Sequence, residues 1–227
     1  MSFREKTIAR VVSRAHAAMH VMTKFTQEKV DDLARKAEER KPFTSIEKEE
    51  ATALYWAFVE GGWIKGYHEA SILLTHYLRK DTVSPVLIDF DMYESEPKVQ
   101  FEMQKVRIAD CDVIRKGATK MIRTSASITA RKMNYADNRF TLKSITRRLD
   151  AQHCETTWEV RSYYRFEDFK GADSKKSHFH AYDQTLIVPD GLSRYLVDQG
   201  IAKEFPYYSV KRESWLCGNG DSRRSAR

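Results

Sequence analysis

Apolar residues recur every three or four positions over residues 4–24, which is the spacing of one face of an amphipathic helix. The set comprises Ile8, Val11, Val12, Ala15, Met19 and Met22. His16 and His20 lie four apart in the same segment, but two histidines do not complete a metal site. Residues 26–41 are almost all helix formers and densely charged, so we expect a solvated helix there.

Thr44 and Glu47 have the spacing of a capping box, which predicts that a further helix begins there. Its expected buried stripe consists of Ala51, Leu54, Tyr55 and Phe58. Gly61-Gly62 interrupts the pattern, and a second apolar set follows at Trp63, Tyr67, Ala70, Leu74 and Tyr77. Either one long helix bends at the glycines or two helices meet there.

After Pro85 the hydrophobic period changes from 3.6 to 2. Ile88, Phe90 and Met92 alternate with two aspartates. Beyond the turn-like residues 94–97, Val99, Phe101 and Met103 alternate with polar residues. Two alternating runs joined by a turn predict a hairpin with one apolar and one polar face.

Further strands are expected along the chain. Residues 120–132 fit either a strand or a helix, and their β-branched and Ser/Thr content favours a strand. Residues 139–149 form its return strand after a turn at 134–138. Two more strands are predicted at 156–168, where alternation is clear, and at 178–188.

Pro189 to Gly191 ends the predicted sheet, and a helix follows through Leu192 and Ile201. An aromatic segment, 205–215, is expected to pack back on the body, and residues 218–227 form a flexible tail. The predicted fold is α+β, with N-terminal helices, an antiparallel meander of about six strands and a C-terminal helix. We expect one domain over residues 1–217, with a helical region over 1–80, a sheet region over 83–188 and a C-terminal helical region over 191–217.

Positive charge is concentrated in one stretch. The chain has a formal net charge of +7, and residues 105–148 contribute 12 Lys or Arg against three acids. Residues 1–104 carry 15 bases and 17 acids, and residues 149–227 carry 12 of each. A localised excess of this kind indicates a surface for a polyanionic partner.

A nucleic acid is the partner that best fits this pattern, because phosphates are neutralised by Lys and Arg on a common surface. Aromatic residues between bases could add base stacking for single strands. The candidate nucleic-acid-binding residues are Arg107, Arg115, Lys116, Lys120, Arg123, Arg131, Lys132, Arg139, Lys143, Arg147, Arg148, Arg161, Tyr163 and Arg165. His178, His180 and Tyr182 would extend the same surface. Surface ion pairs with acids of the N-terminal helices are the structural alternative.

Two other site hypotheses remain open. On the predicted hairpin Asp89, Asp91 and Glu102 would share one face, as in a Mg²⁺-dependent nuclease. This hairpin resembles the restriction-endonuclease core, but the Glu-x-Lys of that family is absent. His178 and His180 would point the same way on a strand and could share a metal. A solvent-exposed strand face explains the two histidines more simply.

No motif for nucleophilic catalysis or phosphate binding occurs. We therefore expect a binding protein that requires no cofactor, with a viral or mobile-element assembly protein as a further alternative. The three widely spaced cysteines favour neither a disulfide framework nor a zinc module. A cytoplasmic protein without a membrane segment is expected, and homo-oligomers are possible.

Overall fold

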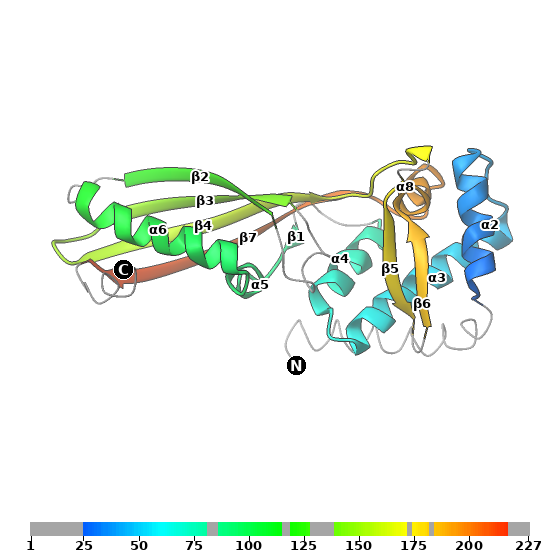
Figure 1. The fold of residues 1–227 in the computed structure, drawn as a ribbon, viewed down its shortest axis with the longest axis horizontal. Helices are drawn as coiled ribbons and strands as arrows, with labels where there is room; N and C mark the ends of the chain where they lie inside the picture. The colour runs from blue at the N-terminus through cyan, green and yellow to red at the C-terminus, as the bar shows by residue number, and fades with distance from the viewer. Residues whose placement is uncertain are drawn as a thin grey trace. The chain divides into compact units, whose positions relative to one another are not determined.

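The computed structural model describes residues 25–80, 86–114, 119–127, 139–171, 174–181 and 184–217. The chain divides into two compact units, which we call the helical unit (residues 1–84 and 163–205) and the sheet unit (residues 85–162 and 206–227). The helices and strands of both are labelled in Figure 1. A single domain over 1–217 stays a prediction.

The described part of the helical unit begins with three helices, which are α2 over Gln27–Glu38, α3 over Ser45–Ile64 and α4 over His68–Leu78 (Figure 1). The predicted capping box is confirmed at the start of α3. Glu47 N donates to Thr44 Oγ1 at 3.3 Å, and Thr44 N donates to Glu47 Oε2 at 2.9 Å. The predicted stripe is buried at every position, namely Ala51, Leu54, Tyr55 and Phe58.

Two helices meet after the glycine pair, and α3 itself runs through Gly61 and Gly62. The helix ends at Ile64, and Gly66 follows with a φ of 80°, the left-handed conformation that terminates many helices. At Gly62 a Cβ atom would lie 2.7 Å from Ser71 Oγ, so the missing side chain allows α3 and α4 to approach closely.

Residues 176–189 form a hairpin rather than the one strand predicted at 178–188. It consists of β5 over Lys176–Ala181 and β6 over Gln184–Pro189, paired antiparallel. Phe179 of β5 stacks on Phe58 of α3 with ring centroids 4.5 Å apart, which attaches the hairpin to the helices. The predicted C-terminal helix is present as α8, over Asp190–Asp198, but it ends before Ile201, and the predicted helical region 191–217 includes a strand over Phe205–Leu216.

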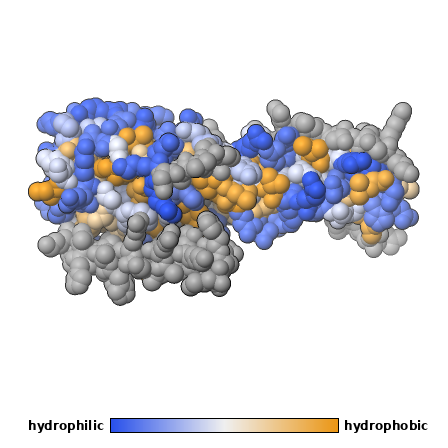
Figure 2. Space-filling model, turned by 180° about the vertical axis from the view of Figure 1, so that it is seen from behind, coloured by the Kyte–Doolittle hydropathy of each residue, from blue (hydrophilic) through white to orange (hydrophobic). Residues whose placement is uncertain are grey.

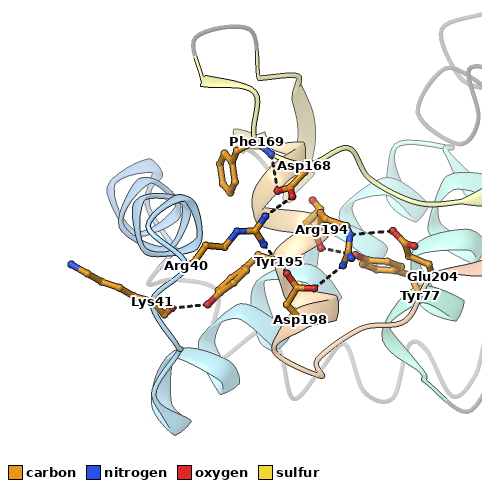
Figure 3. A network of polar contacts seen from close by, with 10 residues as sticks. Arg40, Lys41, Tyr77, Asp168, Phe169, Arg194, Tyr195, Asp198 and Glu204 are labelled. Carbon is orange, nitrogen blue, oxygen red and sulfur yellow. Dashed lines mark hydrogen bonds and ion pairs between the residues drawn. The ribbon is translucent and has the colours of Figure 1, made fainter.

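A network of polar side chains joins the end of α2 to α8 (Figure 3). Arg40 pairs with Asp168 and, at 2.8 Å, with Asp198. Asp198 also accepts from Arg194 of its own helix at 3.0 Å, and Tyr195 OH donates to Lys41 O at 2.9 Å. These bases are engaged within the helical unit, as structural ion pairs.

The sheet unit is built on a mixed sheet with the strand order β1-β7-β4-β3-β2 (Figure 1). Its strands are β1 over Val86–Leu87, β2 over Thr119–Ser127, β3 over Arg139–Arg148, β4 over His153–Tyr164 and β7 over Phe205–Leu216. The pairs β2–β3 and β3–β4 are antiparallel, whereas the two-residue β1 runs parallel to β7. The predicted strand 120–132 is confirmed over residues 120–127, as strand propensity favoured, and its residues 128–132 lie outside the described residues.

The sheet has alternating faces, as the period of two predicts. On β4 Cys154, Thr156, Trp158 and Val160 are buried, and they pair with alternate residues of β3. The buried β3 residues are Phe140, Leu142, Ser144 and Thr146. This covered face packs towards α6, which spans Pro97–Val113 and buries Val99, Met103 and Val106.

The hairpin predicted over residues 88–103 is wrong. Its place is taken by a short helix, α5, over Asp91–Glu94 and by α6. Val99, Met103 and Val106 also fit a period of 3.6, and Pro97 occupies the first helical position, where proline lacks no needed donor. Phe101, expected inside on the hairpin, is 60% exposed. The helical period prevailed because α6 can bury one stripe against the sheet.

The α+β class is confirmed, but the antiparallel six-stranded meander is wrong. The described chain forms a mixed sheet and a separate two-stranded sheet, and the aromatic segment 205–215 lies within strand β7. The predicted helix 4–24 with His16 and His20, the turn 134–138, Tyr182 and the tail 218–227 lie outside the described residues. Within the described ranges, no helix is long and apolar enough to cross a bilayer.

Candidate nucleic-acid interface

The face of the sheet opposite α6 carries exposed and half-buried side chains. We call it the open face and define it by residues of three strands in the sheet unit: Thr141, Lys143, Ile145, Arg147, Glu155, Thr157, Glu159, Arg161, Tyr208, Val210, Arg212 and Ser214. Figure 2 shows the structure from behind, where hydrophilic residues cover much of the visible surface and apolar residues form separate patches.

Bases outnumber acids on the open face. Its bases are Lys143, Arg147, Arg161 and Arg212, and its acids are Glu155 and Glu159. They come from β3, β4 and β7, which lie side by side in the sheet order. Because neighbouring strands are about 4.8 Å apart, these charges share one continuous surface.

Glu159 neutralises some of this charge. Its carboxylate accepts from Lys143 Nζ at 3.3 Å and from Arg161 Nε. Burial by itself raises the pKa of Glu159, but the hydrogen bonds and charges of Arg161 and Lys143 together lower it below the ordinary value. Glu159 is therefore ionised at neutral pH, and Lys143 and Arg161 are partly satisfied within the sheet.

Arg147 and Arg212 remain available for a ligand. Both side chains are exposed, and neither makes an ion pair or hydrogen bond with the residues that the structure describes. Arg147 is opposite Glu155 in the β3–β4 register without a salt bridge to it. These two arginines are the strongest candidates for contacts with phosphate.

Three further predicted bases lie on β2 and β3. In the strand register Arg123 of β2 is paired with Lys143, and Lys120 of β2 is paired with Thr146. Arg139 is the first residue of β3 and is paired with Ser127.

Arg107 and Arg148 are engaged in structural contacts. Arg107 forms a forked pair with Glu213 of β7 at 2.7–2.9 Å, and Glu213 also accepts from Trp158 Nε1. The Arg148 guanidinium donates to the backbone oxygens of Ile114, Asp150 and Ala151. The Arg107–Glu213 pair holds α6 on the sheet, and the contacts of Arg148 fix the turn between β3 and β4.

The remaining predicted residues are not on the open face of the sheet unit. Tyr163, which is 48% exposed, and the exposed Arg165 belong to the helical unit. Arg115, Lys116, Arg131 and Lys132 lie outside the described residues. Of the predicted residues, the structure places Lys143, Arg147 and Arg161 on the open face.

The acidic cluster predicted for a nuclease is not formed on a hairpin face. Asp89 precedes α5 and accepts from the backbone N of Asp91 at 3.1 Å. Glu102 is on α6, where it pairs with Lys105 at 3.2 Å. No group of three or more His, Cys, Asp or Glu suited to a metal occurs within the described ranges.

The two histidines of β5 differ in their surroundings. His178 is exposed. His180 Nδ1 is 3.1 Å from Thr185 Oγ1, and its ring stacks on Tyr67 at 5.7 Å between centroids. A third histidine, His153, belongs to the sheet unit and pairs with Asp150.

Sequence reasoning missed Arg212 and Tyr208, which β7 adds to the open face. In the segment FPYYSVKRESWL the residues Phe205, Tyr207 and Ser209 are buried, and the intervening side chains are less so. The sequence does not show this alternation, because the buried set includes the polar Ser209 and the outward set includes Tyr208 and Val210. The aromatic content therefore suggested packing rather than a strand.

No protein-family model, curated protein or solved structure matches this chain.

Proposed function

We propose that this chain is a non-enzymatic nucleic-acid-binding protein and that the open face of its sheet unit holds the phosphate backbone. The observation that carries the proposal is the pair Arg147 and Arg212, two exposed arginines on that face with no ion pair to any described residue. Arginine is suited to this task because its planar fork can bind a phosphate with two hydrogen bonds.

Base stacking is supported by the apolar margin of the same face. Tyr208 is half-buried on β7, and its parallel neighbour Leu87 on β1 is 64% exposed. Val210, two positions after Tyr208, is 44% exposed. An aromatic ring beside arginines favours single strands, whose unpaired bases can stack on it.

The first prediction concerns salt dependence. Arg147→Ala combined with Arg212→Ala removes two phosphate contacts, so the log–log slope of affinity against salt becomes shallower by about 1.5. Binding should weaken to a similar extent for all sequences. The measurement is fluorescence anisotropy with labelled single- and double-stranded DNA and RNA over a salt series.

The matched control is Lys65→Ala combined with Lys203→Ala, which removes two exposed bases of the helical unit. Equal effects of the two double variants would mean that the open face is not the binding surface. In the same series Tyr208→Ala should cost about 1–3 kcal/mol on single strands and leave the slope unchanged.

An assembly protein with an acidic protein partner is the competing outcome. Polyglutamate of matched charge density would then displace the oligonucleotide as well as unlabelled nucleic acid does. Preferential displacement by nucleic acid supports the proposal, because polyglutamate offers neither phosphates nor bases.

A further inference from the structure

Two cysteines far apart in the sequence lie together in the sheet unit. Cys154 is near the start of β4, and Cys217 directly follows β7, the neighbouring strand. Their Sγ atoms are 3.3 Å apart, and both residues carry thiols rather than a disulfide. Cys154 is fully buried, whereas Cys217 is partly exposed.

We propose that Cys154 and Cys217 are a disulfide site, which a small-molecule disulfide such as oxidised glutathione can close. A disulfide needs about 2.05 Å between its sulfurs, so from 3.3 Å they must approach by about 1.2 Å. Side-chain rotation can supply this movement. The two backbone segments are already adjacent, because Cys217 N donates to Gln152 O just beyond the ends of the two strands.

The different exposure of the two thiols sets the order of the exchange. The Cys217 thiolate attacks one sulfur of glutathione disulfide, which forms a mixed disulfide and releases one glutathione thiolate. The Cys154 thiolate then attacks the Cys217 sulfur and releases the second glutathione. Two protein thiols are oxidised, one glutathione disulfide is reduced to two glutathiones, and the two protons go to the released thiolates.

The bond would tie the end of β7 to the start of β4. It joins residues 63 positions apart, and a cross-link over a loop of this length restricts the unfolded chain strongly. This site does not depend on the proposed function.

The test uses the reduced full-length chain in a series of glutathione redox ratios. After acid quenching and alkylation, mass spectrometry counts the labelled cysteines and maps any cross-linked peptide. We expect the reduced protein to carry three labels and the oxidised protein one, on Cys111, with a peptide that joins Cys154 to Cys217. The melting temperature should rise by about 5–10 °C and fall again with dithiothreitol.

Three single variants complete the test. Cys111→Ala should still form the bond, whereas Cys154→Ser and Cys217→Ser should not gain thermal stability on oxidation. Three labelled cysteines at the most oxidising ratio would overturn the proposal, as would a cross-link to Cys111. A glutathione adduct that persists on Cys217 would overturn it too, because Cys154 would then be unable to resolve it.

Discussion

At the scale of single residues, Asp190 is a buried carboxyl group whose protonation is linked to folding. It lies at the start of α8 and accepts from Ser177 Oγ at 2.7 Å. Burial, the largest cause, raises the pKa of Asp190 above its ordinary value, and the hydrogen bond from Ser177 offsets only some of this. The folded chain therefore binds this proton more tightly than the unfolded chain.

The sign of the pH dependence follows from this raised pKa. The contribution of Asp190 to stability is fully present below the ordinary aspartate pKa and is lost as pH rises through the folded pKa. Asp190→Asn keeps an oxygen for Ser177 and removes the charge, so it should stabilise the protein at pH 7, on the order of 1 kcal/mol. Urea unfolding between pH 3 and pH 8 measures the difference, which should vanish at the acid end.

Glu49→Gln is the matched control, because it neutralises an exposed carboxylate of α3. Its stability relative to the wild-type chain should not follow the pattern of Asp190→Asn. If the two variants give parallel profiles, burial of Asp190 is not the cause of the pH dependence.

Arg40 combines an unfavourable backbone with favourable side-chain contacts. Its φ is 56°, a left-handed conformation that costs a residue with a Cβ roughly 1–2 kcal/mol. Its guanidinium pairs with Asp168 and Asp198 (Figure 3), which holds the chain in place after α2. The backbone and side-chain contributions can be separated by substitution.

Arg40→Gly and Arg40→Ala both remove the two ion pairs, but only glycine relieves the backbone. Arg40→Gly should therefore be more stable than Arg40→Ala by about 0.5–1 kcal/mol, as measured by urea unfolding. At Arg35, inside α2, the alanine variant should instead be more stable than the glycine variant by a similar amount, because alanine is the better helix former. The same order at both positions would contradict the account of Arg40.

At the scale of elements, the free edge of β6 is covered by a side chain. The Gln27 amide donates to Ile187 O and accepts from Ile187 N, both at 2.9 Å. The amide thus occupies the place of a neighbouring strand on this edge. An unpaired strand edge is a template for aggregation, so this contact also protects the hairpin.

Gln27→Ala should destabilise the protein by about 1–2 kcal/mol, because both backbone groups of Ile187 lose their partner. Hydrogen exchange of a peptide covering β6 should become faster. Asp31→Ala is the control, since it removes the other contact of the Gln27 amide but leaves the contacts to Ile187. If hydrogen exchange of β6 is unchanged in Gln27→Ala, the Gln27 amide does not protect this edge.

The helix α6 shows why one element was misjudged from the sequence. Val99 and Met103 are compatible with both periods, so the prediction of a strand rested on Phe101. Phe101 suggested alternation, yet it is exposed, and Val106 is buried on the helical stripe. A short apolar run does not distinguish the two periods, because only the partner surface decides which residues are covered.

At the scale of the whole molecule, the net charge is distributed unequally between the two units. The sheet unit holds 19 Lys or Arg and 13 Asp or Glu, whereas the helical unit holds 20 and 19. The sheet unit thus contributes +6 of the +7. The salt-dependence prediction belongs to this scale, because it tests whether that excess acts as one surface.

The sequence determined the α+β class, the capping box at Thr44, the alternation of β4 and the region of positive charge. These features follow from hydrophobic period, cap geometry and composition, all of which can be read from residues that are close together in the sequence.

Only the tertiary structure decided which charges act together. Arg107 and Arg148 lie in the basic stretch but are used internally, whereas Arg212, from a stretch without net charge, joins the open face. Cys154 and Cys217 come together for the same reason. Pairing of strands brings distant residues side by side, and the register of that pairing depends on what each face can bury.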